Sequence, residues 1–323
     1  MPTPFRFGCQ EFAPESAAQW KDRARRAEDL GYGTFSLADH YIGPGPALDA
    51  AAHPVQTVAA IPAMMAAADA TSSIMVGCRV LCVDYHHPVV LAKELATIDL
   101  LSDGRLEAGF GAGWITSEYT AMGIEMDRPG VRIERLEEVV GLARSFFAGE
   151  DLAIDGAHVT ADGFTAVPRA VQAGGPRVMI GGGSPRVLGL AGRVADIVSV
   201  NFDNSAGKIG ARGLHSGTAE GTTAKIDWIR DGAGDRFDRL ELEIAAYFTT
   251  VTDDTQATLD LMAPAFGFES AQLAAHPHTL IGSVAEICET LQQRRDQYGI
   301  SYITVGGDQM EAFAPVVATL AGT

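Results

Sequence analysis

Strand-like and helix-like segments alternate eight times along this chain, and this alternation limits the fold more than any other feature of the sequence. The predicted strands comprise residues 5–10, 33–37, 74–83, 106–110, 177–180, 196–202, 242–251 and 302–305. The predicted helices comprise residues 16–30, 54–70, 88–101, 132–147, a segment from 185 onward, 225–230, 253–262 with 283–298, and 310–320. Repeated β-α units form parallel sheets, because a helix must cross back between parallel strands. We therefore predict an α/β fold, a single (β/α)8 TIM barrel, with an open doubly wound sheet as the alternative.

The domain organisation follows from the same pattern. The 323 residues would allow two domains, but TIM barrels commonly exceed about 250 residues, and no linker interrupts the repeat. We therefore predict one domain over residues 1–323. Two segments depart from the repeat: residues 151–168 after the fourth strand, which look like a hairpin, and the glycine-rich residues 203–223 after the sixth. Insertions of this kind often carry specificity or cover a site.

The charge balance excludes several classes of partner. The 41 acidic residues outnumber the 24 Lys and Arg residues, giving a formal net charge of −17. A chain this acidic repels nucleic acid and anionic membrane surfaces, so neither is expected as a partner. The longest stretch without charge, residues 50–68, contains His53, Pro54 and Pro62 and reads as a buried helix of a soluble protein. Residues 1–10 do not resemble a secretory signal, which favours a cytoplasmic location.

Cysteine and motif spacing exclude other chemistries. The four cysteines lack the close pairing of a zinc site, so we expect buried thiols and no metal site. Gly109, Gly111 and Gly113 are spaced G-x-G-x-G, which is not the dinucleotide-binding fingerprint G-x-G-x-x-G. The cysteines are Cys9, Cys78, Cys82 and Cys288.

The residues that follow the fifth strand predict an anion site. Gly181, Gly182 and Gly183 let a ligand approach the backbone closely, while Ser184 can cap a helix that starts at Pro185. The exposed amides of a helix start suit a phosphate. The alternative is a tight turn that binds nothing.

Residues after the second and fourth strands are candidates for a ring site and for proton transfer. Gly111 and Gly113 leave room for a flat ligand, and Trp114 either stacks on that ligand or covers the end of the barrel. His40 suits a proton donor or an orienting group, since imidazole titrates near neutral pH, and the neighbouring Asp39 would favour its charged form.

Four segments, in order along nearly the whole chain, carry a resemblance to a known family. They read AEDLGYGTFSLADHY, VLCVDYHHPVVLAKELATIDLLSDGRLEAGFGAGWITSEYTAMGI, RVMIGGGSPRVLGLAGRVADIVSV and TLIGSVAEICETLQQRRDQYGISYITV. With these segments the chain resembles the bacterial luciferase-like monooxygenase superfamily. It is most similar to the actinobacterial branch of oxidoreductases that use the deazaflavin coenzyme F-420.

The resemblance implies roles for particular residues. It implies a flavin-type ring at the C-terminal ends of the strands, with its phosphate near Gly181 to Ser184. It also implies a non-prolyl cis peptide near Arg79 and Val80 that bulges against the ring, and a catalytic histidine at His40 beside Asp39. In the sugar-phosphate dehydrogenases of the family an acidic residue follows the fourth strand. Trp114 stands there in this chain and the nearest acid is Glu118, so the resemblance does not favour sugar-phosphate oxidation.

Three functions fit these observations. The first is hydride transfer between coenzyme F-420 and a small organic substrate, with the chain acting as a homodimer. The second is an FMN-dependent monooxygenase, and the third is a flavin-binding protein without turnover. Coenzyme F-420 carries an oligoglutamate tail, for which Lys208 and Arg212, with Arg186 nearby, are candidate contacts in an acidic chain. Solvated side chains on a loop are the alternative for these cations.

Overall fold

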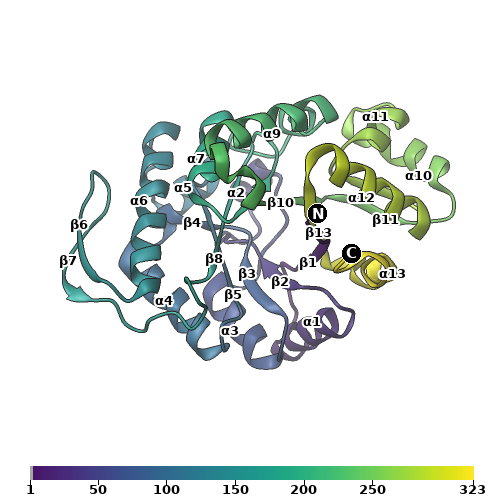
Figure 1. Cartoon of the computed structure of the whole chain (residues 1–323). Coiled ribbons are helices and arrows are strands. Elements are labelled where there is room, and N and C mark those ends of the chain that lie inside the picture. Colours follow the sequence, from purple (N-terminus) through teal and green to yellow (C-terminus); the bar gives the residue numbers. More distant parts are fainter. Residues whose placement is uncertain (1–2) are drawn as a thin grey trace.

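Parallel strands close into a barrel in the computed structural model, which describes residues 3–323 (Figure 1). The hydrogen-bonded order is β3-β2-β1-β13-β10-β9-β8-β5-β4, and an additional pairing of β3 with β5 closes the ring. Because β3 and β4 are two halves of one interrupted strand, the barrel has eight strand positions, and the predicted α/β barrel is confirmed. The barrel strands are β1 (Arg6–Gln10), β2 (Thr34–Leu37), β3 (Met75–Cys78), β4 (Leu81–Cys82), β5 (Leu106–Gly111), β8 (Arg177–Gly182), β9 (Ile197–Val200), β10 (Glu241–Ala246) and β13 (Ile300–Gly306).

Helices surround the barrel, and capping residues in the sequence fix several of their starts. Ser16 accepts a hydrogen bond from the backbone of Gln19 at the start of α1, and Ser283 forms a capping box with Glu286 at the start of α12. The long helices are α1 (Ala17–Asp29), α3 (Ala60–Ala70), α4 (Pro88–Leu101), α6 (Pro129–Ala148), α7 (Pro185–Val194), α9 (Ala219–Ala233), α12 (Val284–Tyr298) and α13 (Met310–Leu320). The shorter ones are α2 (Pro46–Ala51), α5 (Thr116–Met122), α8 (Ala211–Ser216), α10 (Thr255–Met262) and α11 (Ser270–Ala275), with 3-10 turns at Val83–Tyr85, Gly234–Arg239, Ala263–Phe266 and Gly307–Gln309.

The third barrel strand is interrupted at a cis peptide bond. The bond between Arg79 and Val80 is cis, as the resemblance implies, and it separates β3 from β4. The neighbouring strand makes room for the side chain of Val80, since a Cβ built on Gly111 would lie 2.6 Å from Val80 Cγ2. Glycine at position 111 is therefore needed by the packing of the barrel itself.

Both predicted insertions are present. The first contains an antiparallel hairpin of β6 (Asp151–Asp155) and β7 (Thr160–Thr165), which projects away from the barrel in Figure 1. The second runs from residue 203 through α8 into α9, and the backbone N–H of Ile209 in it donates to Ala51 O at 3.0 Å. This hydrogen bond holds the insertion against the end of α2.

Several boundaries predicted from the sequence are wrong. The helix expected over residues 54–70 begins only at Ala60. The helix expected at residues 225–230 begins earlier, at Ala219, because Thr218 caps it. The seventh strand, expected over residues 242–251, is split: β10 stays in the barrel, while β11 (Phe248–Val251) leaves it and pairs with β12 (Thr279–Gly282), a strand that the sequence analysis missed. This parallel pair lies outside the barrel, beside α10, α11 and α12 (Figure 1).

Candidate functional site

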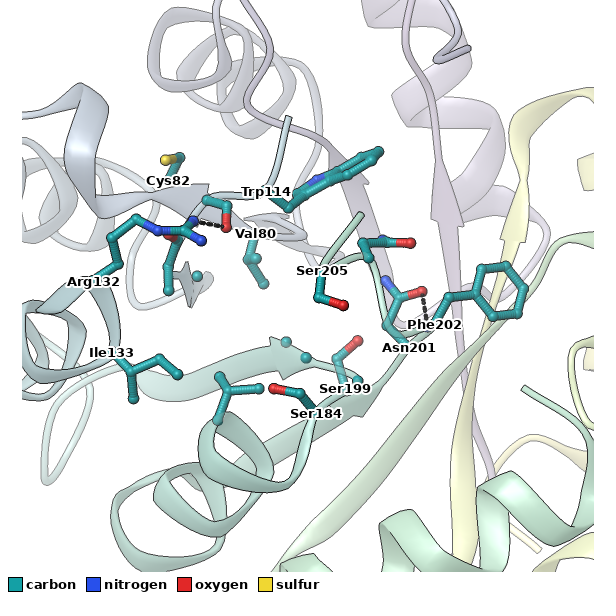
Figure 2. Close-up of a pocket in the computed structure, with 18 of the residues that line it drawn as sticks. Val80, Cys82, Trp114, Arg132, Ile133, Ser184, Ser199, Asn201, Phe202 and Ser205 are labelled. Carbon is teal, nitrogen blue, oxygen red and sulfur yellow. Dashed lines mark hydrogen bonds between the residues drawn. The ribbon is translucent and has the colours of Figure 1, made fainter. Parts of the chain in front are cut away.

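A cavity of about 1160 Å³, including its open mouth, lies at the C-terminal ends of the barrel strands (Figure 2). This is the end at which active sites of such barrels are built. The structure brings all of the predicted site residues together there. The cavity is lined by Asp39, His40, Arg79, Val80, Gly111, Gly113, Trp114, Gly181, Gly182, Gly183 and Ser184.

His40 is held by a buried carboxylate from another element. Its Nδ1 lies 2.7 Å from Oε2 of Glu118, which is fully buried in the first turn of α5. The other carboxylate oxygen accepts the backbone N–H of Tyr41 at 2.7 Å, and the hydroxyl of Tyr85 donates to Oε2 at 3.2 Å. Burial opposes ionisation of Glu118, but these hydrogen bonds together outweigh it and hold the pKa of the carboxyl below its usual value.

This geometry determines which nitrogen of His40 is available. An ionised Glu118 accepts the proton on Nδ1, which leaves Nε2 as the nitrogen that can exchange a proton with a ligand. The sequence analysis noted Glu118 only as the nearest acidic residue and did not predict its contact with His40. A usable signal was its position in the first turn of a helix that follows a barrel strand.

Asp39 does not pair with His40, contrary to the expectation from their adjacency. Its Oδ2 accepts hydrogen bonds from His86 Nε2 at 2.8 Å and from the backbone N–H of Cys82 at 3.0 Å. Its Oδ1 is buried and has no hydrogen-bond partner within residues 3–323. Asp39 therefore holds the loop after β4, and one of its buried oxygens, without a partner among the described residues, lies beside the cavity.

Aromatic rings surround His40. Its ring centroid lies 4.1 Å from that of His53 and 6.2 Å from that of Trp114. His53 donates from Nδ1 to Pro54 O at 2.8 Å, and burial, with a further contribution from His40, lowers the pKa of His53 to about 4. His53 is therefore neutral near pH 7 and packs as an uncharged ring against His40.

The side chain of Arg79 is engaged within the protein. Its Nε donates to Glu243 Oε1 at 2.9 Å and its Nη2 to Ser199 Oγ at 3.0 Å. Burial opposes the charge of Arg79, but Glu243 outweighs it and raises the pKa of the guanidinium. These contacts tie the break in the third strand to β9 and β10, and Val80 lies at the wall of the cavity (Figure 2).

The start of α7 fits a phosphate. Ser184 is the N-cap residue, and among the described residues its side chain makes no capping hydrogen bond. The N–H groups of the first helical turn have no acceptors within a helix, so they and the Ser184 hydroxyl can bind an anion. Gly183 is required by a close approach, since a Cβ there would overlap the carbonyl oxygen of Phe202. The absence of a side chain at Gly183 is therefore needed for the packing of the turn, and it also leaves the backbone accessible to a ligand.

Arg132 lines the same cavity and was missed by the sequence analysis. It is buried on α6, and its guanidinium donates to Ala112 O at 2.9 Å, to Gly113 O at 2.5 Å and to Asp127 O at 3.0 Å. These bonds fix the loop after β5, and Figure 2 shows the side chain reaching across to that loop. Nothing in the sequence near Arg132 distinguishes it from the other arginines of the same helix.

The three cations considered for an anionic tail are all on the surface. Lys208 and Arg212 are exposed in the second insertion, and Arg212 lies 3.8 Å from Asp203. Arg186 is exposed on α7 and pairs with Glu134 at 2.7 Å. Asp203 lines the cavity, so the second insertion borders its mouth.

The remaining features of residues 3–323 concern cysteines, metal ligands and membrane spans. The four cysteines are buried and unpaired. That part of the chain has no cluster of His, Cys, Asp or Glu suited to a metal ion. None of its helices has the length and apolar character needed to cross a bilayer.

Comparison with known proteins gives a consistent result. The family model for luciferase-like monooxygenases matches residues 1–310. An F420-dependent glucose-6-phosphate dehydrogenase of Nakamurella multipartita is 29% identical over 267 residues, which cover 80% of this chain and 72% of that protein. An FMNH(2)-dependent dimethylsulfone monooxygenase of Pseudomonas fluorescens is 26% identical over 169 residues, which cover 52% of this chain and 42% of that protein.

Solved structures show the same fold. An F420-dependent secondary alcohol dehydrogenase in complex with an F420-acetone adduct superposes with a TM-score of 0.75 at 16% identity, covering 98% of this chain and 99% of that one. At this identity the likeness concerns the fold alone. The barrel fold of this chain is therefore the one expected from the family match.

Proposed function

Because the chain belongs to the luciferase-like monooxygenase family and is an oxidoreductase of that family, we propose that it transfers a hydride between coenzyme F-420 and a small organic substrate. The similarity to F420-dependent glucose-6-phosphate dehydrogenases supports this choice of cofactor. The match to an FMNH(2)-dependent monooxygenase favours FMN as the alternative. The family assignment also favours an enzyme over a flavin carrier.

The observation that carries the proposal is the pairing of His40 with Glu118 in the same cavity as Val80 and the start of α7. His40 Nδ1 lies 2.7 Å from the carboxylate, so the neutral imidazole keeps its lone pair on Nε2. A base so oriented can take a proton from a bound hydroxyl group. Val80 would support the ring of the cofactor, and Ser184 with the amides of α7 would hold its phosphate.

In the proposed reaction an alcohol loses its hydroxyl proton and a hydride from the adjacent carbon, and a carbonyl compound forms. When bound, coenzyme F-420 would supply the hydride acceptor. His40 Nε2 takes the hydroxyl proton, and Glu118 stabilises the imidazolium that forms. Trp114 and His53 exclude water from one side of His40. In the reverse direction the imidazolium returns the proton to the oxygen of a carbonyl substrate.

The cavity favours an uncharged substrate. Its lining contains two arginines, Arg79 and Arg132, and both have hydrogen-bond partners within the protein. Its lining also contains the carboxylates of Asp39 and Asp203, which repel an anionic substrate. We therefore propose a small neutral alcohol or ketone rather than a sugar phosphate as the substrate.

Equilibrium titration of the purified protein with coenzyme F-420 and with FMN tests the cofactor. Fluorescence quenching should show tighter binding of coenzyme F-420, and His40→Ala should bind it as well as the unchanged protein does. Preferential binding of FMN would contradict the proposal. Binding of neither cofactor would contradict both enzyme hypotheses.

Three further expectations stay predictions from the sequence. They are a homodimer, a cytoplasmic location and a single domain over residues 1–323.

A further inference from the structure

A second hollow lies beside the main cavity, between the starts of α6 and α7. Its volume, including the open space above it, is about 580 Å³, and it is lined by Arg128, Gly130, Val131, Glu134 and Arg186. We refer to it as the α6–α7 hollow. Of its lining residues, the sequence analysis considered only Arg186, as a cation near the candidate contacts for a cofactor tail, and the family match gives the hollow no role.

The α6–α7 hollow begins where the main cavity ends. On α6, Pro129, Arg132 and Ile133 line the main cavity, while Gly130, Val131 and Glu134 line the hollow. On α7, Ser184 lines the main cavity and Arg186, two residues further on, lines the hollow. A phosphate bound at Ser184 would therefore lie within one helical turn of Arg186, so the part of the ligand beyond the phosphate could enter the hollow.

The hollow is locally positive on a strongly acidic chain. Arg128 is exposed and has no carboxylate within 4.0 Å among residues 3–323. The side chain of Arg186 is 58% exposed and pairs with Glu134 at 2.7 Å. Glycine at position 130 lets the guanidinium of Arg186 lie against α6, because a Cβ there would overlap its Nη1. Two cations and one carboxylate thus face the hollow, in a chain whose formal net charge is −17.

We propose that the α6–α7 hollow binds carboxylates of the oligoglutamate tail of coenzyme F-420 through Arg128 and Arg186. This inference rests on the proposed function, since it takes the phosphate of the cofactor to lie at Ser184. A guanidinium binds a carboxylate through two parallel hydrogen bonds, which suits a chain of carboxylates leaving the cavity. Glu134 opposes the same tail by repulsion. FMN has no such tail, so the hollow would also favour one cofactor over the other.

Two matched double variants test the proposal. Arg128→Ala/Arg186→Ala removes both cations of the hollow, and Lys208→Ala/Arg212→Ala removes the same charge from the second insertion. Each is titrated by fluorescence quenching with coenzyme F-420 that carries several glutamates and with the same phosphorylated chromophore without glutamates. Affinity for the form without glutamates reports whether the main cavity is intact in each variant.

The unchanged protein should bind the form with glutamates more tightly, and this preference should shrink as salt concentration rises. Arg128→Ala/Arg186→Ala should weaken binding of that form by about threefold to tenfold, while the form without glutamates binds as before. Glu134→Gln should strengthen binding of the form with glutamates, because it removes the opposing charge. Lys208→Ala/Arg212→Ala should leave the preference unchanged.

Several results would overturn the proposal. One is equal binding of both forms by the unchanged protein. Another is an equal loss for both forms in Arg128→Ala/Arg186→Ala, and a third is loss of the preference in Lys208→Ala/Arg212→Ala instead. Failure of the unchanged protein to bind any form of coenzyme F-420 would overturn the proposed function, and this inference with it.

Discussion

Two buried polar networks lie at opposite ends of the same barrel, and they differ in how completely their groups are paired. At the N-terminal end, Arg6 bonds Glu107 at 2.7 Å and Glu241 at 2.8 Å, while Tyr302 donates to Glu107 at 3.1 Å. Every carboxylate oxygen of this network has a partner. At the C-terminal end, the network around His40 borders a cavity and contains Asp39 Oδ1, which has no partner within residues 3–323.

This difference suggests that the N-terminal network stabilises the fold, whereas the network around His40 serves ligand binding and catalysis. Fully paired buried charges hold strands together and offer nothing to a ligand, which is the expected role of that end of a barrel. Incompletely paired groups cost stability and persist where a ligand completes them. Substitutions at the N-terminal end should therefore change the free energy of unfolding, and substitutions at the cavity should change turnover.

The largest effect is expected from His40→Ala. If His40 is the proposed base, removing it should lower turnover by about 10² to 10⁴, or about 3–5 kcal/mol in the barrier. Turnover is measured from the absorbance of coenzyme F-420, with the best substrate from a panel of small alcohols. The free energy of unfolding should fall less than in a protein whose buried carboxylate loses its cation, because Glu118 keeps its hydrogen bonds from Tyr41 and Tyr85.

His87→Ala is a matched control for this change. His87 is exposed at the start of α4, and no capping hydrogen bond of its side chain is present in the described structure. Its replacement should leave turnover unchanged. A His40→Ala protein that retains turnover within about threefold would show that His40 is not the base.

Arg6→Met should have the next largest effect, on stability instead of turnover. The change leaves Glu107 buried without its cation, which should lower the free energy of unfolding by about 3 kcal/mol. Urea unfolding followed by circular dichroism measures this loss. Turnover per folded molecule should stay the same, because Arg6 lies at the end of β1 remote from the cavity.

Arg25→Met removes an exposed arginine that pairs with Asp22 on the same helix. Because such surface pairs contribute little, its effect should stay below about 1 kcal/mol. Equal stability of Arg6→Met and Arg25→Met would contradict the structural role of the N-terminal network.

The sequence predicts the frame of the barrel better than it predicts either network. Barrel strands are short apolar runs bounded by turn residues, so their order along the chain is readable from periodicity. The turn from Gly181 to Pro185 is also readable, because its cap and its glycines are local features. Strand β12 is not, because Thr279–Gly282 is short and is defined mainly by pairing with β11.

The partner of His40 could not be predicted for a related reason. Glu118 is 78 residues away in the sequence, and only the closure of the barrel brings α5 beside the loop after β2. The adjacent Asp39 was the obvious candidate, but successive residues point to different sides, and Asp39 bonds His86 instead. Local patterns therefore found the correct loops but not the contacts between them.

Apart from the two control substitutions, the smallest effect is expected from Glu118→Gln, which is also the sharpest test of the comparison. The amide can accept only one of the hydrogen bonds that the two carboxylate oxygens accept from Tyr41 and His40. His40 then loses its fixed tautomer, and the rate should fall by about tenfold, or about 1.4 kcal/mol in the barrier. The cavity keeps its shape, so affinity for the cofactor should be unchanged.

The pH dependence of Glu118→Gln separates an electrostatic role from a merely structural one. Because the pKa of Glu118 is lowered, its carboxylate stays ionised in mild acid, and its contribution to stability is lost only as pH falls through that lowered value. Removing a carboxylate charge that lies 2.7 Å from the proposed base should move the acidic limb of the rate profile to lower pH, even though the maximal rate falls. A slower enzyme with an unmoved acidic limb would show that Glu118 only supports the loop, as the paired carboxylates do at the other end of the barrel.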